Sequence, residues 1–235
     1  MQPAASLDPQ SLVLPENASL FTRLRVAIRI LKVIRGNEGN PAYGQTLNTS
    51  LNGGVYSSLS QKLKRSVEGH RLLSKRPSLE AKDLDLGALE ALPEGTLGQT
   101  FARYFRDNKI TPFETTLEIK NDVDYLAKRY RETHDLLHLV TGYGTDVMGE
   151  MELQAYVLGN LGLWTPALIL TFSSMAALKK NETGVTPAVY LRRLQAAYQR
   201  GRVSPVFLGF WFEDHWGTPL PSLREQLCAP AQWVN

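Results

Sequence analysis

Apolar residues recur at helical spacing along most of the chain. A repeat at i, i+3, i+4 and i+7 places such residues on one face of an amphipathic helix. Residues 20–35 show this repeat first, with Leu24, Ile28 and Leu31 on one face and most of the basic residues on the other. One short stretch, residues 114–120, would suit a strand or an extended turn. The pattern as a whole predicts an all-α fold, organised as a single-domain helical bundle.

Glycine, proline and capping residues predict where the helices begin and end. Residues 36–54 are rich in Gly, Asn, Ser and Thr and are expected to begin as a loop. Gly142 is expected to end one helix, and Thr145 or Asp146 can cap the next. Further helices are expected over residues 55–73, 98–108, 121–139 and 146–156, and from Pro166, Thr186, and Pro221 or Ser222 onward.

The stretch from Leu153 to Leu178 contains no charged residue. A transmembrane helix needs about 20 apolar residues, so the length alone would permit a span. Gly159, Gly162 and Pro166 interrupt the stretch, and proline is well suited to the first turn of a new helix. Two helices buried on most sides therefore fit the pattern better than one membrane span.

Composition indicates an ordinary globular protein. The chain has 235 residues, of which 43% are hydrophobic and 21% charged. We expect one helical domain over residues 17–235, preceded by a flexible tail over residues 1–16 that lacks Lys, Arg and any apolar run of signal-peptide length. A single cysteine, Cys228, rules out an intrachain disulfide and suits a reducing compartment. These features favour a cytoplasmic location.

The net charge of +3 is unevenly distributed. The segment 17–35, an expected basic amphipathic helix, holds five Lys or Arg residues and one acid-free run from Leu20 to Arg35. The rest of the chain is slightly acidic, which argues against a nucleic-acid partner. Either the helix lies on a membrane surface through Arg25, Arg29 and Lys32, or it packs on the core as an ordinary amphipathic helix.

Four residues within a short stretch have the pattern of a metal site. His134 and His138 are four residues apart, so they lie about 40° apart and one turn along a helix, and Asp135 falls within the same arc. If the chain reverses at Gly142, Glu150 on the following helix faces His138. Two imidazoles and one or two carboxylates suit zinc best, with manganese, iron or magnesium as alternatives. Solvated polar residues at a helix end are the alternative without a metal.

The other histidines do not complete a known hydrolase pattern. Zinc peptidases use HExxH with glutamate as the base, whereas this chain has aspartate at that position. Phosphohydrolases of the His-Asp type need a further upstream histidine, and only His70 is available. We expect His70 to lie on the surface and His215 to be a helix-end or packing residue.

The sequence resembles the ubiquinone-biosynthesis family known as the fourth coenzyme Q protein. That family has the signature HDxxH, then eleven residues, then Glu, which His134, Asp135, His138 and Glu150 match. The stretches LPEGTLGQTFARYF, DYLAKRYRETHDLLHLVTGYGTDVMGEMELQAY and FWFEDHW also resemble family blocks, and together the resemblance covers most of residues 60–228. It implies an all-helical protein at the periphery of a membrane that is needed to make polyprenylated quinones.

The resemblance implies two roles that the sequence does not separate. One is metal-dependent decarboxylation coupled to hydroxylation of a prenylated ring. The other is a non-catalytic, isoprenoid-binding scaffold for other quinone-biosynthesis enzymes; a phosphohydrolase acting on a prenyl phosphate is a third possibility. We also expect a homo-oligomer. An apolar groove would hold the isoprenoid tail, and the residues expected to line it are Leu153, Tyr156, Val157, Leu161, Trp164 and Leu168.

Overall fold

The structure is a computed structural model that describes residues 41–115, 117–179 and 183–228, apart from the side chains of 41–42 and 175–179. Parts of the N-terminal segment are also described: residues 12, 14, 18–19, 21–23, 25–26 and 28–29. Helices are the regular structure of these residues, and the only β-type pairing among them is an isolated bridge between Thr96 and Pro219. The all-α prediction is confirmed. Within this part, no helix is both long and apolar enough to cross a membrane.

The chain divides into two compact units: residues 1–76 with 114–131, and residues 77–113 with 132–235. The whole predicted metal motif falls within the second unit. The single domain expected over residues 17–235 stays a prediction, and each unit is described by itself.

The first unit contains α2 (Pro41–Leu63), α3 (Val67–Lys75) and nearly all of α6 (Asp122–Glu132). The loop expected at the start of residues 36–54 is wrong from Pro41 onward, because the polar side chains of α2 are buried and bond to one another. Asn48 donates to the Tyr56 hydroxyl at 3.0 Å, and Asn52 donates to the Asn48 carbonyl at 2.9 Å. A helix whose polar residues point inward does not show an amphipathic repeat.

Asp122, the first residue of α6, is the centre of an ion-pair cluster in the first unit. Its carboxylate lies 2.8 Å from Lys64 Nζ and 3.0 Å from Arg76 Nη2, and it accepts a hydrogen bond from the Ser60 hydroxyl at 3.2 Å. Burial raises the pKa of Asp122, but the bonds from Lys64 and Arg76 outweigh it and lower the pKa below its usual value. The predicted helix over 55–73 is interrupted between α2 and α3, where Lys64 lies.

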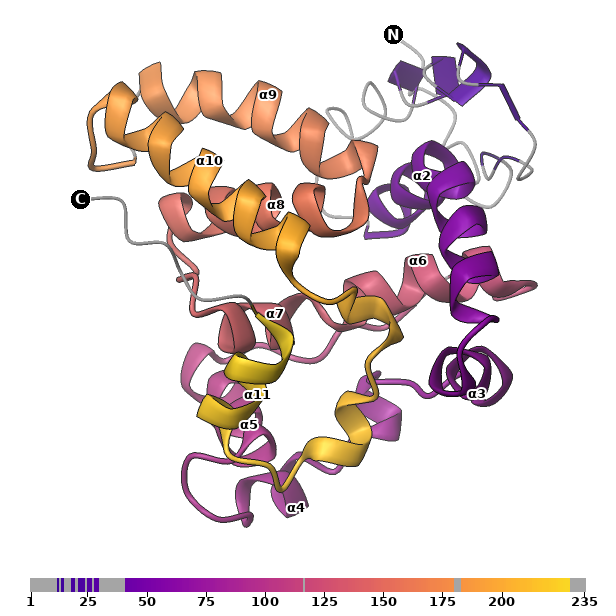
Figure 1. The fold of residues 1–235 in the computed structure, drawn as a ribbon, viewed down its shortest axis with the longest axis vertical. Helices are drawn as coiled ribbons and strands as arrows, with labels where there is room; N and C mark the ends of the chain where they lie inside the picture. Colours follow the sequence, from indigo (N-terminus) through magenta and orange to yellow (C-terminus); the bar gives the residue numbers. More distant parts are fainter. Residues whose placement is uncertain are drawn as a thin grey trace, which may run out of the picture. The chain divides into compact units, whose positions relative to one another are not determined.

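In the second unit, α8 (Val147–Leu161), α9 (Trp164–Lys179) and α10 (Pro187–Val203) pack together, with α8 against both of the others (Figure 1). Glycines allow α8 and α10 to touch backbone to backbone. A Cβ at Gly159 would lie 2.1 Å from the Tyr198 carbonyl oxygen, and one at Gly201 would lie 2.1 Å from the Tyr156 carbonyl oxygen. Any larger residue at either position would force the two helices apart.

The remaining helices of the second unit surround α7 (His134–Thr141), which packs against α5 (Leu97–Asn108), α8 and α11 (Leu220–Leu227). Figure 1 shows α7 between the α8–α10 layer and the pair formed by α5 and α11. A short helix, α4 (Leu86–Glu90), packs on α5. Three 3₁₀ turns also belong to the second unit: Ala81–Asp83, Phe207–Gly209 and Phe212–His215.

Most predicted helix ends agree with the structure. Asp146 caps α8, and Thr186 caps α10 with Pro187 at its first turn. The helix expected from Asn121 to Leu139 is instead divided at Thr133 into α6 and α7. The start predicted for α9 is also wrong: α9 begins at Trp164, so Pro166 is its third residue. Proline is tolerated there because the first-turn N–H groups have no partner within the helix.

Candidate metal centre

The two histidines of the motif lie on α7 and the glutamate on α8. Because α7 begins at His134, His134 and His138 are one turn apart on the same short helix. Gly142 ends α7 with a φ of +79°, a left-handed conformation that glycine adopts without strain. The chain then turns, and the Asp146 carboxylate accepts a hydrogen bond from the Gly149 N–H at 2.7 Å, which starts α8. This turn brings Glu150 back beside the two histidines.

The three side chains converge on one point. His138 Nε2 lies 3.1 Å from Glu150 Oε1 and 3.3 Å from His134 Nε2, and His134 Nε2 lies 3.6 Å from Glu150 Oε2. A zinc ion with ligands at 2.0–2.2 Å in tetrahedral geometry would hold its donor atoms roughly 3.3–3.6 Å apart. The spacing of the three donors therefore fits a metal ion held between them, and the donor types fit one too.

The second ring nitrogen of His138, Nδ1, also has the kind of partner that a metal-binding histidine needs. His138 Nδ1 donates to the Tyr143 carbonyl oxygen at 3.1 Å, so a neutral His138 would carry its lone pair on Nε2, which is directed at the cluster. His138 is buried, whereas Glu150 is about one third exposed, with 35% of its side-chain surface accessible. The cluster is thus closed on the His138 side and accessible on the Glu150 side.

Electrostatics in the metal-free protein favour an ionised Glu150. Burial raises the pKa of Glu150, but the hydrogen bonds from His134 and His138 outweigh this effect and lower it to about 2. Burial lowers the pKa of His138, and the hydrogen bond to Glu150 and its charge raise it further than burial lowers it. A carboxylate that is already ionised is ready to bind a cation.

Asp135, the fourth predicted ligand, is not part of the group of three whose donor atoms lie within 4.8 Å of one another. Its carboxylate instead accepts a hydrogen bond from the Tyr104 hydroxyl on α5 at 3.4 Å. Burial, together with Asp135 and Glu150, raises the pKa of Tyr104 to about 12, so the phenol stays neutral and can donate. The sequence did not identify Tyr104 as a site residue, because along the chain Tyr104 is only one of several aromatic residues at helical spacing.

Side chains from later elements hold the end of α7. Arg224 donates to the Leu139 carbonyl oxygen through Nε at 3.0 Å and Nη2 at 2.8 Å, and Arg200 donates to the Thr141 carbonyl oxygen at 2.7 Å. The last carbonyls of a helix lack partners within it, and cations near them are favourable. These contacts fix a helix of only eight residues that would not be stable alone.

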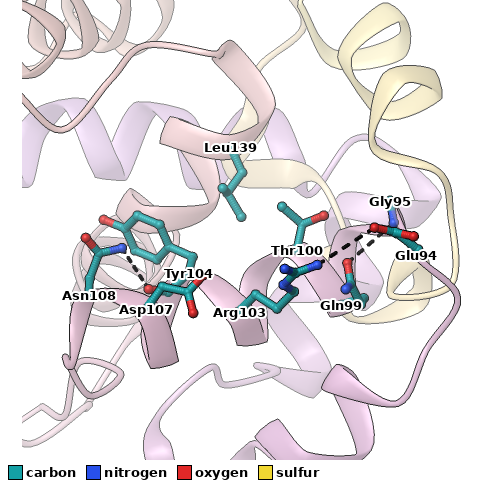
Figure 2. A pocket seen from close by; sticks show the side chains of 9 residues that line it. All are labelled: Glu94, Gly95, Gln99, Thr100, Arg103, Tyr104, Asp107, Asn108 and Leu139. Carbon is teal, nitrogen blue, oxygen red and sulfur yellow. Dashed lines mark hydrogen bonds and ion pairs between the residues drawn. The ribbon is translucent and has the colours of Figure 1, made fainter.

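A pocket of about 450 Å³ lies along α5 (Figure 2). Tyr104 belongs to its wall and also donates to Asp135, whereas His134, His138 and Glu150 do not line the pocket. Figure 2 shows Leu139 opposite the residues of α5, with an ion pair between Arg103 and Glu94 at one end. None of the six predicted lipid-lining residues contributes to this pocket.

The six predicted lipid-lining residues differ in exposure. Those on α8 are mostly buried: Leu153, Tyr156 and Val157 are inaccessible to solvent, and Leu161 is half-buried. On α9, Leu168 is half-buried and Trp164 is 48% exposed. The lipid-binding assignment itself stays a prediction.

The predicted membrane-surface helix lies only partly within the described residues, and Lys32 lies outside them. Arg25 and Arg29 are exposed, but Ile28, which belongs to the predicted apolar face, is 56% exposed as well. Arg23, the one cation that the repeat places on the apolar side, is buried and donates to the Ser50 carbonyl oxygen at 2.7 Å. The buried cation explains why the repeat was imperfect there.

The two remaining histidines, His70 and His215, have the environments that the sequence predicted. His70 on α3 is exposed. His215 stacks on Phe210, with ring centroids 4.6 Å apart, and contacts the Thr218 hydroxyl at 3.3 Å. His215 is therefore a packing residue.

The chain resembles known proteins in both its sequence and its fold. Residues 41–230 match the profile of the family described as coenzyme Q (ubiquinone) biosynthesis protein Coq4. Proteins named "Ubiquinone biosynthesis protein COQ4 homolog, mitochondrial" from Mus musculus and Homo sapiens are each 32% identical to the chain, over 172 and 173 residues respectively. The matches cover 72% of this chain and 63% of each relative, so the chain spans less than two thirds of their length.

A solved structure shares the fold. It is the crystal structure of a protein from Nostoc punctiforme PCC 73102 that is provisionally assigned to ubiquinone biosynthesis. The two chains are 25% identical, with a TM-score of 0.68, and the match covers 87% of this chain and 95% of the Nostoc chain.

Proposed function

The chain belongs to the Coq4 family of coenzyme Q (ubiquinone) biosynthesis proteins, and from this we propose that it binds a divalent metal and a prenylated aromatic intermediate, and assists loss of the ring carboxylate. The observation that supports the proposal is the convergence of His134, His138 and Glu150, whose donor atoms lie within 4.8 Å of one another. Quinone biosynthesis requires reactions on the aromatic ring, and a metal ion with an open coordination position could assist them.

The residues of the centre have distinct parts in this proposal. His134, His138 and Glu150 would hold the metal, and Asp135 is a further carboxylate one residue from His134. A bound metal of this kind polarises a carboxylate or a phenolate oxygen. Tyr104 donates to Asp135 and so limits the directions in which that carboxylate can point. Zinc is the first choice for this donor set, with manganese and iron next.

The apolar part of the intermediate would lie along α8 and α9. Val157 and Leu161 continue the face of α8 that carries Glu150, because they follow it by seven and eleven residues. A head group at the metal would thus direct an isoprenoid tail along this uncharged face, where Leu161 is half-buried and Val157 would have to be uncovered. We include Leu153, Tyr156, Trp164 and Leu168 as the neighbouring apolar residues. Arg25, Arg29 and Lys32 are proposed as contacts to a membrane surface that supplies the lipid.

The proposal is tested by release of carbon dioxide. The purified chain is loaded in turn with zinc, manganese or ferrous iron and given a polyprenylated 4-hydroxybenzoate labelled in its carboxyl carbon, with and without dioxygen. Metal-dependent release of labelled carbon dioxide is expected. It should be lost in His138→Ala and kept in His70→Ala, a matched change of an exposed histidine.

Two other results would point elsewhere. If the wild-type chain binds the lipid and the metal but releases no carbon dioxide with any metal, the non-catalytic scaffold is favoured. If His138→Ala binds metal as well as the wild-type chain does, the metal centre itself is wrong.

A further inference from the structure

Gln154 on α8 has a buried side-chain oxygen that lacks a partner. The residue is 6% exposed, and its Oε1 is one of the few buried side-chain atoms in the described part of the chain without a hydrogen bond. Removing an amide oxygen from water without replacing its hydrogen bond is unfavourable, and nearly all buried polar groups in native proteins are paired. An orphan of this kind needs an explanation.

The position of Gln154 relates it to the metal centre. It follows Glu150 by four residues on one helix, which places it about 40° around and about 6 Å along the axis. Side chains on an α-helix lean toward its N-terminus, which directs that of Gln154 toward the turn that carries Glu150. Toward the C-terminus of α8, Val157 and Leu161 lie on the same face of the helix as Glu150. Gln154 is thus the polar residue between the metal ligand and an apolar stretch.

We propose that Gln154 is a substrate-positioning residue, whose Oε1 accepts a hydrogen bond from a phenolic hydroxyl of the ring bound at the metal. This inference rests on the proposed function. A hydrogen-bond acceptor without a partner is satisfied by a donor, and a phenol supplies an O–H donor. A methyl ether of the same ring and an ionised phosphate group have none. Gln154 would therefore select a free hydroxyl on the ring and set where the tail begins.

The first test measures selectivity by titration calorimetry on the metal-loaded full chain. The two probes are a polyprenylated 4-hydroxybenzoate and its 4-O-methyl ether, which share the carboxylate and the tail. The wild-type chain is expected to prefer the phenol by about 3- to 10-fold, the contribution of one net hydrogen bond. Gln154→Met, a change of similar shape, should bind both probes equally and retain its metal.

The second test separates this role from a structural one. Gln99 on α5 is also buried, but its Oε1 accepts a hydrogen bond from the Gly95 N–H at 3.4 Å. Without ligand, Gln154→Met should melt at the same temperature as the wild-type chain or higher, because it removes an orphan atom. Gln99→Met should melt lower, because it removes a partnered one, and should keep the preference for the phenol.

The outcomes are distinguishable. If the metal-loaded wild-type chain binds neither probe, the proposed function and the role of Gln154 are both overturned. If it binds both probes equally, only the role of Gln154 is overturned, and this result needs no variant. A preference that persists in Gln154→Met, or a melting temperature that falls as in Gln99→Met, would likewise show that Gln154 does not read the hydroxyl.

Discussion

Two carboxylates, one in each unit, have similar surroundings but differ in whether they could bind a metal. Asp122 in the first unit receives nitrogen donors from Lys64 and Arg76. Glu150 in the second unit receives them from His134 and His138. In both cases the partners outweigh the effect of burial, and the pKa of the carboxyl group falls.

The difference lies in what the nitrogen atoms can do. Lysine and arginine are protonated at neutral pH and have no lone pair to offer, so the cluster at Asp122 can only be an ion pair. A neutral imidazole offers a lone pair, so the cluster at Glu150 can exchange its protons for a metal ion. The charge pattern around a carboxylate therefore does not show whether a metal could bind there, whereas the identity of its nitrogen partners does.

The largest expected effect is on metal content. Glu150→Ala should lower metal affinity by more than about 100-fold, since even residues that only orient a ligand contribute 10- to 100-fold. Asp122→Ala should bind metal as the wild-type chain does. Elemental analysis after metal loading and dialysis measures both, with circular dichroism to check helix content. Equal metal content in the two variants would show that the nitrogen partners do not decide which carboxylate binds a metal.

A smaller effect is expected at Tyr104. Tyr104→Phe removes the hydroxyl that bonds to Asp135 and should lower metal affinity by about 10-fold, if Asp135 contributes to binding as the signature predicts. Tyr198→Phe on α10 is the control, because that side chain is half-buried and lies outside the centre. Competition with a fluorescent chelator gives both affinities. Identical values would show that the Tyr104 hydroxyl does not support metal binding.

Asp122 should affect stability instead. Asp122→Asn is expected to lower the free energy of unfolding by about 1 kcal/mol, a modest value because Lys64 is partly exposed. Urea denaturation at neutral pH measures the change. Asp107→Asn, which alters an exposed ion pair with Arg106, should cost less than about 0.5 kcal/mol. A loss at Asp107 as large as that at Asp122 would contradict the special role of the Asp122 cluster.

The smallest effect concerns pH. The pKa of Asp122 is lower in the folded protein than its ordinary value of 3.8, so its ionised form stabilises the fold above that pH. The contribution is lost as pH falls through the folded pKa. The difference in unfolding free energy between the wild-type chain and Asp122→Asn should therefore be constant near neutral pH and shrink below about pH 4. A difference that grows on acidification would have the wrong sign.

The sequence predicted the helical hairpin that carries His134, His138 and Glu150 well, because local signals determine it. The spacing of His134 and His138, the glycine at 142 and the cap at Asp146 all lie within one short stretch. Tyr104 could not be predicted as their neighbour, since it is 31 residues from Asp135 along the chain. Its contact depends on how α5 packs against α7, which no local pattern encodes.

The N-terminal half of α2 was missed for a different physical reason. Polar residues such as Asn48 and Asn52 favour loops when they face water, because they compete for backbone hydrogen bonds. In α2 they are buried and satisfy one another, which leaves the backbone free to be helical. Distinguishing the two cases requires knowing what is buried, which the composition of the segment does not reveal.

The arginines at the end of α7 have a consequence for local unfolding. A helix of eight residues would ordinarily open on its own, in a small and frequent fluctuation. Here, opening must also release Arg200 on α10 and Arg224 on α11. The amides of α7 should therefore exchange with solvent deuterium as slowly as those of the larger helices that hold it. The histidines would then belong to the most persistent cooperative unit of this part of the chain.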